Sequence, residues 1–330
     1  MNVMRVENYM KRIVTVIIAI IAVISISTAQ DVNEAVNAYN SGFEAFQAKN
    51  YEEALAQLEE CIAIAEEIGE EADEVRLNAE SLIPKTYYQI GRGLADQKKY
   101  KEAIKKFEET IKMAEYYGDN ESKSKAEKYL PNLWYGLAIG NYKKGDFEGG
   151  LKACDNAIAK NEKFTKAFYM KTAIYKAMDD AENVKSSALK AIEVANSVND
   201  KKISSGTKKQ AIAYFLKKAE ASKQANKPEE AITFLKTSLE FDDKNANAYM
   251  VMATIYFSQS KWQNAIDAYK NALQNKAFDP EKEAGLYFQI ASAHQKLGNT
   301  GEACAAFKKA AVGAYKENAE YQMKNVLKCE

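Results

Sequence analysis

A recurring pattern of aromatic and small residues organises the chain after residue 30. In its clearest copy, Tyr249 is followed four positions later by Ala253, and nine positions after that Trp262 opens a second apolar stretch. Ala265 and Ala272 then follow within the second stretch. The pattern predicts pairs of helices joined by short turns, and it leaves little of the chain for other structure.

Seven copies align when the small residue of each first helix is taken as the eighth position. The fourth position holds Ala38, Tyr87, Trp134, Phe168, Phe215, Tyr249 and Tyr287. The eighth holds Gly42, Gly91, Ala138, Thr172, Ala219, Ala253 and Ala291. The twentieth holds Ala54, Ala103, Gly150, Val184, Ala231, Ala265 and Ala303. The twenty-seventh holds Cys61, Thr110, Ala157, Ala191, Ser238, Ala272 and Ala310.

Close packing explains this distribution of sizes. Two antiparallel helices approach to about 8–10 Å only where small side chains lie at their crossing, whereas a large fourth-position ring fills the space toward a neighbour. Because the small positions recur in seven registers, the pattern carries more weight than the alanine content of any one helix.

This unit resembles the tetratricopeptide repeat, a helix-turn-helix of about 34 residues. The resemblance implies an all-α, right-handed superhelical solenoid of about seven repeats over residues 30–330. Two copies depart from the pattern, since Ala181 and Pro228 open second helices where an aromatic residue is usual. Proline suits a first helical turn.

The copies are unevenly spaced. The residues that open the second helices are Tyr51, Tyr100, Phe147, Ala181, Pro228, Trp262 and Thr300, at intervals of 49, 47, 34, 47, 34 and 38. Two inserted segments, 70–83 and 120–130, are rich in Glu, Lys and Ala, so we expect them to lengthen the flanking helices. Pro84 and Pro131 either start first helices or kink longer ones.

A final segment, 312–330, is expected to form a capping helix. Tyr315, Ala319, Met323 and Val326 share one face of it, and such a cap covers the apolar face that a terminal repeat would otherwise expose.

The N-terminus has the three parts of a secretory signal peptide. Lys11 and Arg12 precede a mostly apolar run over 13–26, and Ser27-Thr28-Ala29 forms a small-residue cleavage site. A run of about 14 residues is too short to span a bilayer, so we expect cleavage after Ala29 and no stable membrane anchor afterwards. Residues 1–9 precede a second methionine, Met10, and are open to interpretation as an upstream-start artefact. The expected location is periplasmic or secreted.

Composition argues against nucleic acid as a partner. Lysine and arginine number 46, as do aspartate and glutamate, so the formal net charge is zero. Arginine, the residue best suited to bidentate phosphate and base contacts, occurs only at positions 5, 12, 76 and 92. Nothing in the chain provides the electrostatic footprint of a nucleic-acid-binding protein.

The sequence offers no catalytic constellation, cofactor motif or metal site, so we predict that the protein is not an enzyme. The one histidine, His294, falls at the eleventh position of copy seven, a register expected to face the core. The four cysteines have no zinc or CxxC spacing. Export permits disulfides, and Cys304 and Cys329 would face each other across an antiparallel helix pair. A bridge there, or two free thiols, are both compatible with the sequence.

The resemblance implies binding of a protein or peptide partner by a non-catalytic scaffold. In tetratricopeptide repeats the concave groove is lined by positions near the fifth, ninth and twelfth of each first helix. The expected partner-binding residues are therefore Tyr39, Tyr88, Tyr135, Tyr142, Tyr169, Met250, Phe257 and Phe288. Lys143, Lys176 and Lys223 lie beside them and would hold acidic groups.

Two alternatives stay open. The aromatic side chains could only pack between repeats, in which case they bind no partner. The protein could also be a structural subunit of an envelope assembly or transport complex that docks through its convex surface.

Overall fold

The computed structural model describes residues 32–329, and the predicted signal segment lies outside them. Within the described residues the chain is helical and has no strand. Residues 32–47 are helical, and the longer helices that follow are α2 (Tyr51–Ile68), α3 (Asp73–Asp96), α4 (Tyr100–Tyr117), α5 (Asn120–Lys143), α6 (Phe147–Lys160), α7 (Thr165–Ala177), α8 (Ala181–Ser197), α9 (Lys201–Gln224), α10 (Pro228–Phe241), α11 (Ala246–Ser258), α12 (Trp262–Asn275), α13 (Pro280–Lys296) and α14 (Thr300–Ala310). A short 3-10 turn, η1 (Glu70–Ala72), lies between α2 and α3.

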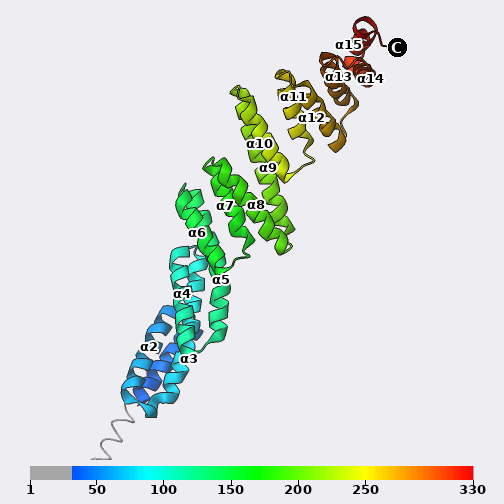
Figure 1. Cartoon of the computed structure of the whole chain (residues 1–330). Helices are drawn as coiled ribbons and strands as arrows, with labels where there is room; N and C mark the ends of the chain where they lie inside the picture. The colour runs from blue at the N-terminus through cyan, green and yellow to red at the C-terminus, as the bar shows by residue number, and fades with distance from the viewer. Residues whose placement is uncertain (1–31, 330) are drawn as a thin grey trace, which may run out of the picture. The chain divides into compact units, whose positions relative to one another are not determined.

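Successive helices form the predicted hairpins, as Figure 1 shows for α3 with α4 and for α11 with α12. The chain divides into two compact units between Ala167 and Phe168, inside α7, and each is described by itself. The first unit contains the helices up to α6, and the second contains α8 onward. The all-α repeat architecture predicted from the sequence is confirmed.

The predicted start of every second helix is confirmed. Each opening residue is the first residue of its helix. Two positions before it, the backbone is left-handed in all seven hairpins, at Lys49, Lys98, Gly145, Asp179, Asn226, Ser260 and Gly298. A turn that reverses the chain between two α-helices requires this conformation, which glycine adopts without strain and other residues adopt less readily.

The small-residue positions are buried as the packing argument requires. The eighth, twentieth and twenty-seventh positions are buried in all seven copies. A Cβ added to Gly42 would lie 3.0 Å from Leu58 Cγ, and one added to Gly91 would lie 3.0 Å from Phe107 Cδ2. The partner helix therefore approaches too closely for a larger side chain.

The fourth-position aromatic residues are less buried than the packing argument suggests. Phe215 is fully enclosed, but the other five aromatic residues at this position are half-buried. Tyr87 donates a hydrogen bond to a Glu59 carboxylate at 3.2 Å, and Lys106 Nζ lies 4.9 Å from the Tyr87 ring centroid. Lys309 Nζ likewise lies 4.9 Å from the Tyr287 ring centroid, so these two tyrosines join adjacent helices at the edge of the core.

The inserted residues lengthen helices. Residues 70–72 of the first inserted segment form η1, and the rest of it lies in α3. The second inserted segment lies in α5. These two helices, and α9 within the third long interval, are each 24 residues long, as the composition predicted for the first two. Pro84 and Pro131 lie inside α3 and α5, so they do not start these helices.

The C-terminal cap differs from the predicted helix over 312–330. Val312 is extended and Gly313 is left-handed, so the helical path ends after α14. The cap consists of a 3-10 turn η2 (Gly313–Tyr315), a six-residue α15 (Lys316–Tyr321) and a π-helical turn η3 (Gln322–Leu327). Ala319 is buried, and Met323 packs on the core. Val326, however, is 48% exposed, because the wider π turn rotates it off the predicted face.

The cysteines divide into two kinds. Cys304 in α14 and Cys329 after η3 form a disulfide with a Cα–Cα distance of 5.8 Å. Cys61 and Cys154 are buried and lie outside any disulfide. Burial raises the pKa of the Cys61 thiol to about 11, so it is protonated and unreactive at neutral pH.

His294 is buried, as its register predicted, and its Nδ1 lies 3.5 Å from Asn299 Nδ2. Over residues 32–329, His, Cys, Asp and Glu side chains nowhere gather in a group able to hold a metal ion. None of the described helices combines the length and the apolar character needed to cross a bilayer.

Candidate partner-binding surface

The predicted fifth-position side chains are half-buried in every copy. They are Tyr39, Tyr88, Tyr135, Tyr169, Leu216, Met250 and Phe288. Tyr88 packs edge-on against Phe107 and Tyr129, with centroid distances of 5.4 and 5.9 Å. Each such residue thus has one part in the repeat core and one part at the surface. Half-burial is compatible both with packing between repeats and with contact to a partner, the two interpretations that the sequence left open.

The twelfth-position aromatic residues pack within their own hairpins. Phe46 lies 5.4 Å from Tyr51, Tyr142 lies 6.0 Å from Phe147, and Phe257 lies 5.0 Å from Trp262, measured between ring centroids. In each pair the partner is the residue that opens the second helix. This contact closes the hairpin, so Tyr142 and Phe257 have a structural role whether or not they also contact a partner.

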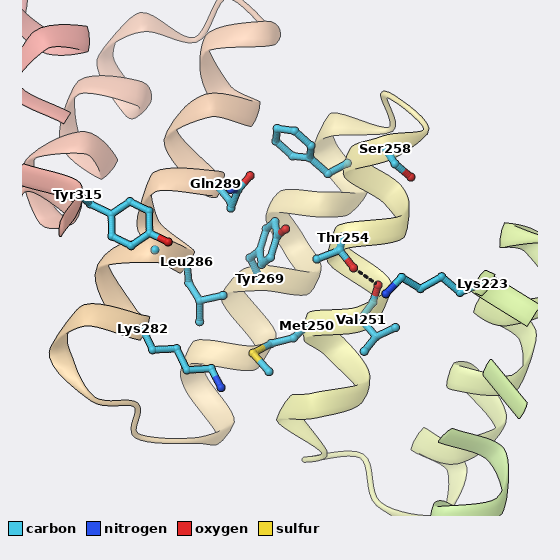
Figure 2. A pocket seen from close by; sticks show the side chains of 12 residues that line it. Lys223, Met250, Val251, Thr254, Ser258, Tyr269, Lys282, Leu286, Gln289 and Tyr315 are labelled. Atoms are coloured by element: carbon cyan, nitrogen blue, oxygen red, sulfur yellow. Dashed lines mark hydrogen bonds between the residues drawn. The ribbon is translucent and has the colours of Figure 1, made fainter. Parts of the chain in front are cut away.

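A pocket of about 540 Å³ opens on the second unit between α11, α12, α13 and η2. Met250, Val251, Thr254, Phe257 and Ser258 line one wall from α11. Gly285, Leu286 and Gln289 of α13 line the opposite wall, and Tyr315 of η2 closes one end (Figure 2). Its volume lies within the range of about 300–1,000 Å³ that encloses small ligands or anchoring side chains.

Tyr269 of α12 supplies a polar group at the base of the pocket. The residue is only 2% exposed, and its hydroxyl has no hydrogen-bond partner among the described residues. Burial raises the pKa of this phenol to about 12, so the neutral form persists. The hydroxyl is not among the enclosed polar atoms that lack a partner, so it is accessible from the pocket and can bond a group that enters there.

Two lysines flank the apolar part of the pocket, as Figure 2 shows. Lys223 comes from the last turn of α9 and lies 3.5 Å from the Glu220 carboxylate. Lys282 comes from the first turn of α13, and its Nζ lies 5.3 Å from the Phe278 ring centroid. The pocket therefore combines an apolar wall, the hydroxyls of Tyr269 and Tyr315, and two cations at its rim.

The structure brings only some of the predicted site residues together. Met250 and Phe257 line the pocket, and Phe288 adjoins it through Tyr315, whose ring centroid is 5.6 Å away. Tyr169 lies instead near α9, where a Cβ added to Gly206 would be 3.6 Å from its ring. Tyr39, Tyr88, Tyr135 and Tyr142 belong to the first unit and to none of the pocket walls.

Sequence reasoning missed Tyr269, which sits at the twenty-fourth position, a core position in the other copies. One signal for the pocket was present. Gly285 is a glycine inside a helix, where glycine is unfavourable. A Cβ at this position would lie 2.8 Å from the Tyr315 hydroxyl, so the glycine admits the cap residue to the pocket.

Comparisons with solved structures found other repeat proteins of low identity. A crystal structure of MamA protein is 20% identical, covers 60% of this chain and 97% of that chain, and has a TM-score of 0.29. A crystal structure of YrrB, described as a TPR protein with an unusual peptide-binding site, is 14% identical, covers 59% of this chain and 88% of that chain, and has a TM-score of 0.28. The TPR2AB-domain:pHSP90 complex of yeast Sti1 is 12% identical, covers 90% of this chain and 97% of that chain, and has a TM-score of 0.33. With TM-scores this low, nothing further about this chain follows from them.

No curated protein sequence matches the chain. Models of the tetratricopeptide repeat match it in three separate places, at residues 43–68, 216–280 and 284–311. These matches fall on copies one, five, six and seven of the pattern found in the sequence. The chain is a tetratricopeptide-repeat protein.

Proposed function

We propose that this protein is an exported, non-catalytic scaffold that binds a peptide or protein partner on the surface formed by its first helices. Repeat proteins of this architecture present extended surfaces for binding other chains. The observation that carries the proposal is the pocket above Tyr269, an apolar cavity onto which the hydroxyl of this otherwise buried tyrosine opens.

The pocket chemistry indicates what part of a partner enters it. Met250, Val251 and Leu286 favour an apolar side chain, since burying one contributes about 1.5–3 kcal/mol. The Tyr269 hydroxyl can donate to, or accept from, a peptide group that follows the side chain into the pocket. Lys223 and Lys282 at the rim favour a carboxylate beside the apolar anchor. An apolar residue flanked by an acidic one fits these features.

A peptide selection tests the proposal. We would select binders of residues 30–330 from a phage-displayed random peptide library, synthesise the best one with a fluorescent label, and measure its Kd by anisotropy. Tyr269→Phe removes only the hydroxyl and should weaken binding about three- to tenfold. Tyr256→Phe is the matched control, because Tyr256 lies on α11 in the same unit but outside the pocket walls.

Met250→Ala should weaken the same peptide further, and its control is Met178→Ala, a methionine that is exposed on the same unit. Circular dichroism checks that helix content is unchanged in each variant. Wild-type affinity in both Tyr269→Phe and Met250→Ala would contradict the proposed site.

Docking through the second helices is the competing function. Tyr116 of α4 is 78% exposed and Leu189 of α8 is 43% exposed, so large apolar side chains also lie on second helices. If Tyr116→Ala and Leu189→Ala reduce capture of a partner while Tyr269→Phe does not, the protein is a subunit that docks through its outer surface.

Export is part of the proposal because of the residues over 11–29. Cleavage after Ala29 would give a mature chain that begins at Gln30. Mass spectrometry of the N-terminal peptide of protein recovered from the extracytoplasmic fraction should identify Gln30 as the first residue, as glutamine or as its cyclised pyroglutamate form. Recovery of a chain that still contains the 13–26 run would indicate an anchor instead.

A further inference from the structure

A second cleft, of about 570 Å³, lies on the first unit between the α3–α4 turn and the C-terminal half of α5. Five lysines line it, namely Lys98, Lys99, Lys101, Lys143 and Lys144. Glu102 is the single acidic residue in its wall. The lysines come from two segments about 40 residues apart in sequence, so the fold gathers them (α4 and α5 in Figure 1).

None of these five lysines has an ion pair with another described residue, although lysines elsewhere in the first unit do. Lys106 pairs with Glu109 at 2.8 Å and Lys123 pairs with Glu115 at 2.8 Å. A cationic cleft whose charges find no partner within the unit has a positive potential that attracts anions.

The N-terminus of α4 adds to this positive potential. Lys99 is the residue before α4, and its side chain does not cap the free backbone N–H groups of the first turn. By contrast, Asp146, Asp180 and Asp200 cap α6, α8 and α9 with carboxylates. The first turn of α4 therefore keeps the partial positive charge of a helix N-terminus beside the lysines.

Two glycines of α5 shape the floor of the cleft. A Cβ on Gly136 would lie 2.7 Å from Tyr100 Cε1, so this glycine seats the Tyr100 ring. Gly140 also lines the cleft, but a Cβ added there would meet nothing within 4 Å. Glycine is unfavourable inside a helix, and here it leaves open space rather than admitting a neighbour.

We propose that this cleft is a second binding site, which takes an acidic segment of a partner polypeptide. The charge of the walls requires an anion, and the volume falls within the range that encloses ligands. The walls contain lysines but no arginine, so they attract carboxylates without the bidentate forks typical of phosphate sites. Tyr100 and Asn141 supply hydrogen-bonding groups that suit a peptide backbone. This site differs in unit and in chemistry from the apolar pocket of the second unit.

Anisotropy with the full chain and a fluorescein-labelled peptide of alternating glutamate and glycine tests the proposal. The triple substitution Lys99→Gln, Lys143→Gln, Lys144→Gln should weaken binding about tenfold. Its matched control, Lys105→Gln, Lys112→Gln, Lys128→Gln, removes the same charge from exposed lysines of the same unit outside the cleft. Equal loss in both triples would mean that only net charge is sensed, and would overturn the site.

Gly140→Leu fills the cleft without changing charge, and it should weaken binding at least as much as the triple substitution while leaving the helix intact. Gly93→Leu is its control, since Gly93 is likewise inside a helix with nothing within 4 Å of an added Cβ, but outside the cleft. Full binding by Gly140→Leu would overturn the proposal.

Competition and sedimentation identify the source of the anion. Displacement of the peptide by inorganic polyphosphate at lower concentration than by unlabelled peptide would replace the acidic polypeptide with a phosphate ligand. Self-association of the wild-type chain in analytical ultracentrifugation that is lost in the cleft triple would assign the cleft to a second copy instead of a partner. Binding of the peptide by the monomer, with weak polyphosphate competition, supports the proposal.

Discussion

Lys99 and Lys261 occupy the same place in their repeats, one residue before the second helix, yet only one of them has an ion pair. Lys261 lies 2.7 Å from Glu229, which follows the opening residue of the preceding second helix. The corresponding acidic residue before Lys99 is Glu52, and no ion pair joins these two. The opening residues Pro228 and Trp262 are 34 residues apart, whereas Tyr51 and Tyr100 are 49 apart. In this pair of turns, the 34-residue interval brings the lysine to the glutamate of the preceding turn, whereas the longer interval does not.

The twenty-fourth position of the repeat also differs between the two units. Phe107 in the first unit is covered by the rings of Tyr88 and Tyr129, at centroid distances of 5.4 and 5.3 Å. Tyr269 in the second unit has its hydroxyl at a pocket. The position in the repeat determines how deeply the side chain is buried. The surrounding side chains determine whether a pocket forms next to it.

The largest expected effect comes from emptying this core position in either unit. Phe107→Ala and Phe307→Ala should each lower the free energy of unfolding by about 3–5 kcal/mol, since both side chains are fully buried. Trp262→Ala should have a smaller effect, because Trp262 is only half-buried. Urea titrations followed by circular dichroism measure all three. If Trp262→Ala lowered the free energy of unfolding as much as Phe307→Ala does, burial would not determine the size of the effect.

Reduction of the disulfide should lower the stability of the second unit and leave that of the first unchanged. The bridge closes a loop of 25 residues in the second unit, so its loss should cost about 3 kcal/mol there. Trp134 lies in the first unit and Trp262 in the second, and the chain has no other tryptophan. Fluorescence of a Trp134→Phe variant should shift to lower urea under dithiothreitol, while that of a Trp262→Phe variant should not. Equal shifts would indicate that the units unfold together.

The smallest expected effect is a pH dependence confined to the second unit. Burial, aided by Lys270, lowers the pKa of His294 below its usual 6.5, while Glu302 and Asp267 act in the other direction. Below that usual value the unfolded chain takes up a proton that the native state resists, so stability falls as pH falls from 7 toward 5. The loss should be the smallest of the three effects, because a single imidazole is responsible for it.

The comparison is made with His294→Gln, which should show a shallower slope over the same pH range in the Trp134→Phe background. If stability changed with pH equally in both proteins, His294 would not be the cause of the pH dependence, and carboxylate groups would be.

Much of the fold could be predicted because the same pattern of small and large residues recurs in all seven copies. Each small residue at a helix crossing restricts how near the partner helix lies, and this restriction appears in every copy. The cap could not be predicted in the same way. It occurs once, and extended backbone at Val312 with a π turn after Tyr321 depends on packing that periodicity does not encode.

The candidate sites were predictable only in part. Met250 and Phe257 follow from the first-helix register, but Tyr269 reaches its pocket from a second helix, and Lys98 and Lys143 meet only after the chain has folded. Which half-buried ring faces a cavity depends on the spacing between adjacent helices, and insertions of about 13–15 residues change that spacing.

The left-handed residue in each of the seven turns bears on how the chain acquires its structure. A reversal that is specified two residues before each second helix lets every hairpin form from contacts close in sequence, without waiting for distant segments. Chains dominated by such local contacts fold rapidly, and their N-terminal parts can form while synthesis continues. For a protein of this kind, each hairpin emerging from the ribosome is a nucleus on which the next can assemble.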